Sequence, residues 1–430
     1  MEKLDSLLHL WDGWDRFPGG RPFPRKENQD ALGKLSESKG LLVKGCRASG
    51  KSTLLRLLAM DYLHRGASRE SIIFLDLEDP IWSYLPNKNE YLDEILNRRP
   101  KLLLLDGLER IENWEPVLFK SIRRGITTIA SITGKARPTI KDLGVQELLP
   151  MSLSSWISIY TDKKVDSESG RDYLIKYLKA GGLPVTRLAV GRRQALIEVF
   201  YSSLLKDVLL RKGVRAPKVL TAMAVYLMKN TGRPVSAARM RGSISRSMDQ
   251  SRMLLDHLVD SGLVSLVSRL EDANRIANQS ARLVFASDTG LAVALWPQLA
   301  DGKLENLYSL ALTATYHHCS RMGQQVWSWR FDKGFGLALG DGGIAYLMID
   351  LQVKEGKADI SRLQSAMTRY GCKKGLLLTM DEQGSSSGIK IVPLWKWLMV
   401  ESTDISNNIE QTVMKVEKSK KSKKLPRHLL

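Results

Sequence analysis

The sequence of 430 residues predicts a multidomain α/β protein, and three observations support this fold class. Apolar strand candidates alternate with helical stretches in the first third of the chain, which is the pattern of a parallel sheet flanked by helices. Two short helices and an alternating strand are predicted within 233–270, and further strand and helix candidates follow up to residue 402. The length exceeds one ordinary core, so several domains are expected.

Four short apolar runs in the first region are predicted strands: 39–44, 71–80, 101–106 and 125–134. Between the first two runs, apolar residues recur at helical spacing until Gly66, a typical helix stop. Strands joined by such helical crossovers lie parallel, so their carboxyl ends meet at one edge of the sheet.

The turn between the first strand and its helix, 45–52, reads GCRASGKS and fits the pattern G-x-x-x-x-G-K-[ST]. In such a turn, backbone N–H groups and the positive end of the helix hold phosphates. We therefore predict ATP and Mg²⁺ as cofactors, with Lys51 on the phosphates and the Ser52 hydroxyl on the metal. The predicted nucleotide contacts are Gly45, Cys46, Arg47, Ala48, Ser49, Gly50, Lys51, Ser52 and Thr53. A chance match in a basic loop is the alternative, and both flanking elements argue against it.

A second part of the magnesium site is predicted at Asp106, the last residue of an apolar run. Many ATPases of this kind have a glutamate directly after that aspartate, where it orients the attacking water. Here Gly107 takes that place, and Glu109 and Glu112 are the nearest acidic residues. The predicted catalytic residues are Lys51, Asp106 and Glu109, and slow or lost ATP hydrolysis is the alternative to an active ATPase.

Positive charge is concentrated in two segments of a chain whose net charge is +19. Residues 206–252 hold 11 Lys and Arg against 2 acidic residues, and residues 415–430 hold 7 against 1. Such concentration suggests a polyanionic partner, and a solvated helix face with a disordered tail is the alternative.

Residues 233–270 have the organisation of a winged helix-turn-helix. Ser236 is predicted to cap a short helix, Gly242 to lie in the turn, and Ser245 to cap a second helix that stops at Gly262. The apolar side of the second helix is predicted to consist of Met248, Leu254, Leu255, Leu258 and Val259. The predicted DNA contacts are Arg239, Arg241, Arg246 and Arg252. Asp249 on the same face opposes DNA binding, so packing or protein contact is the alternative.

The motifs resemble those of the prokaryotic, archaeal-type AAA-family ATPases that are fused to a C-terminal PD-(D/E)XK-nuclease-like domain. The resemblance covers about residues 30 to 400 and rests on Gly45, Arg47, Gly50, Lys51, Ser52, Asp106 and Trp114. It continues through 177–188 and 201–236, which are similar to the linker helices of that family. Three places depart from the family pattern: Gly107, Lys135 after Thr133 and Gly134, and Val145 where an arginine finger is expected.

The resemblance implies that the C-terminal region has the fold of a restriction-type nuclease, which cuts DNA with a metal held by carboxylates. Glu305, Gln352 and Lys354 match places in that site, whereas the central aspartate is missing and only Asp341 lies near in sequence. One sure carboxylate holds a divalent cation poorly, so the resemblance implies a degenerate nuclease-like domain.

The predicted domains follow from these motifs and the resemblance. They are an N-terminal extension (1–30), a P-loop AAA-type ATPase domain with a parallel sheet (31–155), a helical linker or lid (156–215), a winged helix-turn-helix (216–297), a degenerate nuclease-like α/β domain (298–402) and a basic disordered tail (403–430).

The leading functional hypothesis is an ATP-dependent switch that engages DNA or a protein partner through its basic winged helix. The alternatives are a DNA-binding or interaction protein with a hydrolytically inactive nucleotide site, and a metal-dependent nuclease. No membrane span or signal peptide is predicted, and the three cysteines lack metal-ligand spacing, which favours a cytoplasmic protein. The oligomeric state stays open.

Overall fold

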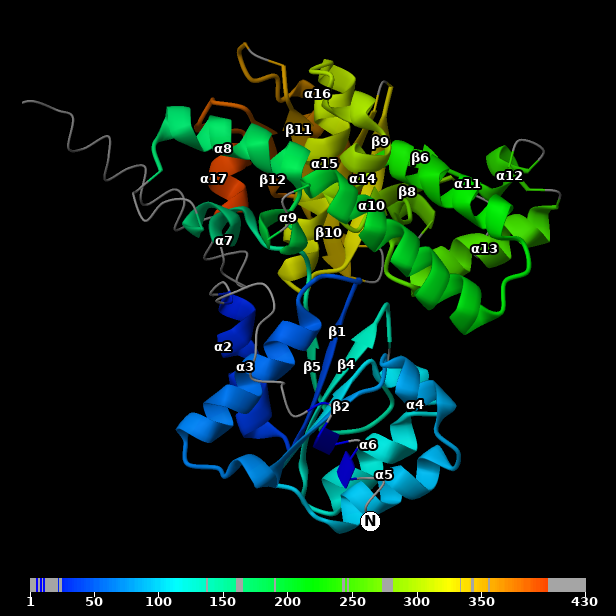
Figure 1. Ribbon diagram of the computed structural model, residues 1–430. Coiled ribbons are helices and arrows are strands. Elements are labelled where there is room, and N and C mark those ends of the chain that lie inside the picture. Colours follow the sequence, from blue (N-terminus) through cyan, green and yellow to red (C-terminus); the bar gives the residue numbers. More distant parts are fainter. Residues whose placement is uncertain are drawn as a thin grey trace, which may run out of the picture.

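The computed structural model describes residues 5–6, 8–9, 11, 22, 25–136, 138–159, 165–188, 191–241, 244–245, 247–272, 281–332, 334–341, 344–354 and 356–400. These residues form an N-terminal lobe, drawn in blue and cyan, and a second lobe, drawn in green, yellow and red (Figure 1). Each lobe has its own large hydrophobic core. Within the described ranges, no helix is long and apolar enough to cross a membrane.

The N-terminal lobe contains a five-stranded parallel sheet with the strand order β2-β3-β4-β1-β5. Its strands are β1 (Gly40–Gly45), β2 (Ile72–Asp76), β3 (Leu102–Asp106), β4 (Thr127–Thr133) and β5 (Gly144–Glu147). Strands β1 to β4 agree with the four predicted strands. The register places Asp76 opposite Asp106 and Gly45 opposite Thr133, so these four strand ends lie at one edge of the sheet.

Helices cover both faces of this sheet (Figure 1), because its central strands are buried along almost their whole length. Helix α3 begins at Lys51, directly after the glycine-containing turn, and buries Leu54, Leu55 and Leu58. The helices of this lobe are α2 (Lys26–Glu37), α3 (Lys51–His64), α4 (Pro80–Tyr84), α5 (Lys88–Asn97) and α6 (Glu115–Arg123), with the 3₁₀ turns η2 (Arg69–Ser71) and η3 (Leu108–Arg110).

The second lobe begins with linker helices and continues with a small three-stranded sheet. The linker contains α7 (Leu153–Ser158), α8 (Ser167–Ala180), α9 (Val185–Leu188), α10 (Arg192–Ser202) and the π-helix η4 (Ser203–Leu210). The elements that follow are α11 (Pro217–Lys229), β6 (Arg233–Val235), α12 (Ala237–Met240), α13 (Met248–Asp260), β7 (Val264–Val267), η5 (Leu270–Asp272) and β8 (Arg282–Ala286). The three strands are antiparallel in the order β6-β8-β7.

The helix caps of this unit confirm one prediction and correct another. Ser236 caps α12 as expected, since its side chain accepts a hydrogen bond of 3.4 Å from the Arg239 N–H. Ser247, and not Ser245, caps α13 by accepting a hydrogen bond of 3.1 Å from the Gln250 N–H. Ser245 is buried instead, and its hydroxyl donates to the Ser247 carbonyl oxygen at 3.2 Å. Helix α13 ends just before Gly262, as predicted.

The remainder of the second lobe is a six-stranded mixed sheet with flanking helices, in the order β13-β14-β12-β11-β10-β9. The elements are α14 (Thr289–Leu295), η6 (Pro297–Ala300), α15 (Leu304–Arg321), β9 (Val326–Phe331), β10 (Gly334–Asp341), β11 (Ile344–Gln352), α16 (Ser361–Tyr370), β12 (Gly375–Thr379), β13 (Gly384–Ser386), β14 (Ile389–Pro393) and α17 (Leu394–Leu398). One continuous core joins the linker helices, the three-stranded sheet and one face of the six-stranded sheet.

A buried carboxylate joins the linker to α14. Asp288 is 2% exposed and accepts hydrogen bonds from the N–H groups of Gly182 (2.6 Å) and Leu291 (2.9 Å). Burial raises the pKa of Asp288 to about 6, although its backbone donors oppose the shift. Gly181 has a φ of +76°, and a Cβ at this position would lie 2.0 Å from Asp288 Oδ1. The junction therefore accepts only glycine at residue 181.

Candidate nucleotide site

The turn between β1 and α3 has a backbone shape suited to anions. Ala48 (φ +61°) and Gly50 (φ +102°) take left-handed conformations, and Gly50 is the N-cap of α3. Gly45 is closely packed, since a Cβ there would lie 2.3 Å from the Leu148 carbonyl oxygen. Such alternating conformations turn successive N–H groups toward one point beside the positive end of the helix.

Lys51 lies over the loop that it follows. Its side chain is buried, and Nζ donates to the carbonyl oxygens of Gly45 (3.2 Å) and Cys46 (2.9 Å). Ser52 and Thr53 follow in the first turn of α3 and are half-buried. Burial raises the pKa of the Cys46 thiol to about 11, so this cysteine is neutral at physiological pH. The ammonium group of Lys51 bonds only neutral carbonyl oxygens here, and a phosphate oxygen is a stronger acceptor for it.

Asp106 lies at the carboxyl end of β3 and accepts a hydrogen bond from the Ser131 hydroxyl of β4. Ser131 Oγ in turn accepts a hydrogen bond of 2.9 Å from the Gly107 N–H. Burial and the neighbouring charge of Asp106 raise the pKa of Asp76, its partner in register on β2. The Asp106 carboxylate and the Ser52 hydroxyl are oxygen donors of the kind that Mg²⁺ prefers, and both belong to the same edge of the sheet. These residues therefore fit a magnesium ion.

Three carboxylates gather beside Asp106. Their oxygens, which belong to Glu78, Glu109 and Asp207, all lie within 4.8 Å of one another. Glu109 is buried, and neither of its carboxylate oxygens makes a hydrogen bond of normal geometry to a described residue. Burial raises the pKa of Glu109, although the positive charge of Lys51 opposes the shift. Glu109, the predicted catalytic glutamate, thus lies near Lys51, but its burial disfavours the ionised carboxylate.

Arg47, in the turn 45–52, joins two of these carboxylates. It donates to Glu78 through Nη1 (3.0 Å) and Nη2 (2.7 Å), and to Asp207 through Nε (2.9 Å) and Nη2 (2.7 Å). Arg110 lies beside the group, 3.4 Å from Glu78 and 3.8 Å from Asp207. Asp207 belongs to the linker helix η4 and is 1% exposed. The turn 45–52 is therefore bridged directly to the second lobe.

The second lobe also contacts the end of β4. Arg211 Nη1 donates to the Thr133 carbonyl oxygen at 3.1 Å. The Lys135 N–H donates to the Asp260 carbonyl oxygen at 3.0 Å, and Lys135 Nζ donates to the Ser265 hydroxyl at 3.0 Å. The position where the family resemblance expects a polar sensor residue thus contacts the end of α13.

Two glycines allow the lobes to approach backbone to backbone. A Cβ on Gly134 would lie 2.0 Å from the Asp260 carbonyl oxygen. A Cβ on Gly262 would lie 3.3 Å from Gly134 Cα and 3.6 Å from Cys46 Cα. The three-stranded unit therefore rests directly on the turn 45–52, with no side chain at either glycine to separate them.

Buried ion pairs make a third contact with this turn. Arg25 donates to the carbonyl oxygens of Ser49 (2.8 Å) and Leu149 (2.6 Å) and pairs with Glu27 at 3.0 Å. Glu27 also lies 3.7 Å from Arg321 at the end of α15. Although burial opposes it, the charges of Arg25 and Arg321 lower the pKa of Glu27. The ion pairs hold the six-stranded part of the second lobe close to the turn.

The structure places the other predicted residues away from this site. Val145, where an arginine finger is expected, lies on the edge strand β5 opposite Leu42. Arg239, Arg241 and Arg252 are exposed on or beside α12 and α13, and Arg252 lies 3.9 Å from Asp249. The predictions for Arg246, for Gly242 and for the tail 403–430 concern residues outside the described ranges.

Of the residues named for a nuclease site, Glu305 lies in the first turn of α15 and Lys354 follows β11 directly after Gln352 and Val353, whereas Asp341 lies far from Gln352. Asp341 lies opposite Ile344 at the β10–β11 hairpin, whereas Gln352 is at the other end of β11. Gln352 is eight residue steps along the strand from Ile344, which corresponds to roughly 27 Å. Asp341 is thus near the other residues in sequence but does not supply the missing aspartate beside Gln352. The buried Asp350 of β11 is paired with Arg362 of α16.

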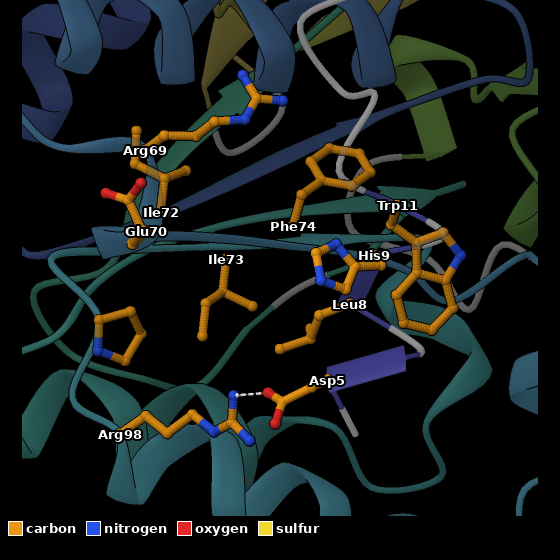
Figure 2. A pocket seen from close by; sticks show the side chains of 11 residues that line it. Asp5, Leu8, His9, Trp11, Arg69, Glu70, Ile72, Ile73, Phe74 and Arg98 are labelled. Carbon is orange, nitrogen blue, oxygen red and sulfur yellow. Dashed lines mark hydrogen bonds and ion pairs between the residues drawn. The ribbon is translucent and has the colours of Figure 1, made fainter. Parts of the chain in front are cut away.

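Of two cavities lined by described residues, one adjoins the predicted phosphate contacts Gly45 and Cys46, and the other does not. One of about 400 Å³ lies beside the amino-terminal half of β2, where Arg98 pairs with Asp5 at 2.6 Å and where His9, Trp11 and Phe74 contribute to the wall (Figure 2). Its lining residues do not include Asp76, Asp106 or the turn 45–52. The other, of about 330 Å³, lies between the lobes and is lined by residues of both.

The fold and the site define an AAA-type P-loop ATPase domain. Residues 37–148 match a family described as an AAA domain, AAA_14, and residues 171–302 match a domain of unknown function, DUF8612. The second match covers much of the linker and the three-stranded unit and does not identify a nuclease.

Relatives of known sequence or structure are distant. An uncharacterised protein of Haemophilus influenzae is 23% identical over 390 residues, which cover 83% of this chain and 94% of the relative. A Walker-type ATPase of Pyrococcus abyssi is 12% identical, with a TM-score of 0.37 over 64% of this chain and 96% of that chain. AMPPCP-bound DnaA from Aquifex aeolicus is 15% identical, with a TM-score of 0.24 over 52% of this chain and 74% of that chain.

Proposed function

We propose that this protein is an ATP-dependent switch. Mg-ATP bound at residues 45–52 changes how the second lobe packs on the N-terminal lobe, and this change alters how a basic face engages DNA. The observation that carries the proposal is that the predicted phosphate contacts also contact the second lobe: Arg47 bonds Asp207, and Cys46 lies against Gly262. A ligand shifts such an equilibrium only by binding one arrangement better. Phosphate competes with Asp207 for Arg47. The arrangement in which Arg47 holds Asp207 therefore differs in its affinity for ATP from the arrangement in which this contact is broken.

We also propose that the unit from α11 to β8 is a winged helix-turn-helix whose α13 is the recognition helix. Its order of helix, strand, two helices and two strands supports this assignment, as do the exposed arginines. Recognition helices place their N-terminal residues in the major groove. The C-terminal end of α13 contacts Lys135 of the ATPase lobe. DNA and the ATPase lobe would therefore hold opposite ends of one rigid helix, which is a direct route for coupling.

The switch is tested by measuring the affinity for a double-stranded DNA at fixed salt, with and without Mg-ATP. We expect ATP to change the Kd at least about fivefold, because allosteric coupling energies are typically 1–3 kcal/mol. The Lys51→Ala protein should bind DNA with a Kd that ATP does not change. A parent protein whose Kd is the same with and without ATP would exclude the switch and leave a DNA-binding or interaction protein with an inactive nucleotide site.

The DNA-binding face is tested through the salt dependence of that Kd. Replacing Arg239 and Arg241 together by alanine should reduce the slope of log K against log salt by about 0.9 for each lost phosphate contact. Arg65→Ala is the control, because Arg65 is exposed at the end of α3 in the other lobe. An unchanged slope in the double variant would show that DNA binds elsewhere or not at all.

We propose that the region from α15 to α17 is a degenerate nuclease-like domain without cleavage activity. The order of one helix, three strands, a helix and a strand from α15 to β12 supports the fold. In the sheet Gln352 lies opposite Thr379, and the nearby Asp350 of the same strand is paired with Arg362, which argues against catalysis. Chelator-sensitive cleavage of plasmid DNA that is lost in Glu305→Ala would favour the nuclease alternative.

A further inference from the structure

We infer that Glu78 supplies the carboxylate that is missing at Gly107, so that it orients the water that attacks ATP, and that Arg47 controls its position. The inference rests on the proposed binding of ATP at residues 45–52. It assigns the hydrolytic role to a residue of a different strand from the one that carries Asp106.

The geometry at Gly107 is the first support. Gly107 has a φ of +83°, and a Cβ there would lie 2.8 Å from Glu78 Cγ. The Glu78 side chain thus occupies the space that a side chain at residue 107 would need. Glu78 reaches this space because Asp76 and Asp106 are in register, and the Leu77 N–H donates to the Asp106 carbonyl oxygen at 2.9 Å. Two neighbouring strand ends therefore deliver the two carboxylates.

The charge of Glu78 is the second support. Burial opposes ionisation, but the hydrogen bonds and charge of Arg47, with the charges of Arg110 and Lys206, lower the pKa of Glu78 to about 2. Glu109 has the opposite tendency, since burial raises its pKa. The Glu78 side chain is also 24% exposed, whereas that of Glu109 is buried. Of the two, Glu78 is the ionised carboxylate that a water molecule can reach.

Arg47 makes the position of Glu78 sensitive to nucleotide. It holds Glu78 and the linker residue Asp207 at the same time, and it belongs to the turn that receives the phosphates. A triphosphate competes for the guanidinium group, because phosphate oxygens are strong acceptors for arginine. Loss of the Arg47 contacts would free Glu78 for water, while the charges of Arg110 and Lys206 would still favour its ionised form. It would also release Asp207, so hydrolysis and lobe packing respond to the same event.

The reactants of the chemical step are ATP and one water molecule. The water oxygen forms a bond to the γ-phosphorus while the bond from that phosphorus to the bridging oxygen breaks, and ADP leaves with the electron pair. Glu78 accepts a hydrogen bond from the attacking water and takes its proton, which it then releases to solvent. Positioned carboxylates contribute about 10²–10⁴-fold in such steps.

The test compares the parent protein with Glu78→Gln, Glu109→Gln and the control Glu112→Gln. Glu112 is exposed beyond η3 and has no part in the carboxylate group. For each protein, the Kd for Mg-ATP and the rate of phosphate release are measured with and without DNA. We expect Glu78→Gln to bind ATP at least as tightly as the parent and to turn it over at least about a hundredfold more slowly. Glu112→Gln should match the parent.

Three outcomes would overturn the inference: a parent protein that does not release phosphate, a Glu78→Gln protein with parental turnover, or a loss of turnover in Glu109→Gln alone. If Glu78→Gln does not fold, Glu78→Asp is tested in its place, because it keeps the negative charge beside Arg47. We then expect ATP turnover at least tenfold slower than that of the parent, and parental turnover would contradict the role of Glu78. The effect of ATP on DNA affinity is measured in the same variants. A switch that responds to ATP without turnover survives even if the assignment of Glu78 fails.

Discussion

Replacing Lys51 by alanine is expected to weaken ATP binding by about a hundredfold. Hydrogen bonds to charged groups contribute about 1.5–3 kcal/mol each, and 1.4 kcal/mol is a factor of ten in Kd. Lys51 is buried over the turn and already donates to the carbonyl oxygens of Gly45 and Cys46. Its Nζ is thus held beside the backbone that is expected to bind the phosphates, and alanine cannot replace it. Titration with a fluorescent ATP analogue in the presence of Mg²⁺ measures the change.

Lys44→Ala is the matched control for this prediction. It removes the same charge from β1, one residue before the turn, where Lys44 lies 3.8 Å from Glu147. Lys44→Ala should bind ATP with the parental Kd. Equal Kd values in the parent and in both variants would contradict a phosphate site at residues 45–52.

The largest loss of stability is expected for Gly181→Ala. A non-glycine residue in this backbone region costs about 1–3 kcal/mol. The new Cβ would also lie 2.0 Å from Asp288 Oδ1, so the buried carboxylate would have to leave its backbone donors. We expect a total of about 3–5 kcal/mol, because steric clashes and lost buried hydrogen bonds account for the largest effects of single substitutions. A thermal unfolding experiment should show a midpoint several degrees below that of the parent.

Gly33→Ala is the control for Gly181→Ala. Gly33 lies inside helix α2, and nothing lies within 4 Å of a Cβ at that position. Alanine should therefore stabilise the helix by about 0.5–1 kcal/mol. If both substitutions lowered the midpoint by the same amount, the close contact with Asp288 would not be the cause.

Local signals in the sequence were sufficient for most of the N-terminal lobe. Strands β1 to β4, the turn 45–52 and Asp106 were predicted because each depends on a short apolar run or a motif of a few residues. Strand β5 was missed because Val145 is its only apolar residue. The cap of α13 was placed at Ser245 because two nearby serines can both cap, and only tertiary burial of Ser245 decides for Ser247.

The carboxylates of the site were harder to predict because their contacts are long in sequence. Arg47 contacts Glu78, 31 residues away, and Asp207, 160 residues away. No periodicity or motif spacing records such pairs. The acidic run after β2 was a usable signal for Glu78, since carboxyl ends of parallel strands meet at one edge. The distance of Asp341 from Gln352 was hidden for a related reason, because only the register of β10 and β11 shows which strand residues are neighbours.

The close approach of Gly134 and Gly262 has a mechanical consequence. Side chains in an interface can absorb a small displacement by changing rotamers, but two backbones in contact have no such freedom. A shift of the turn 45–52 by a few tenths of an ångström would therefore reach α13 almost undiminished, through Cys46 and the end of β4. The two glycines make this interface stiff, and a stiff interface is what the proposed switch requires if a bound nucleotide is to displace the second lobe.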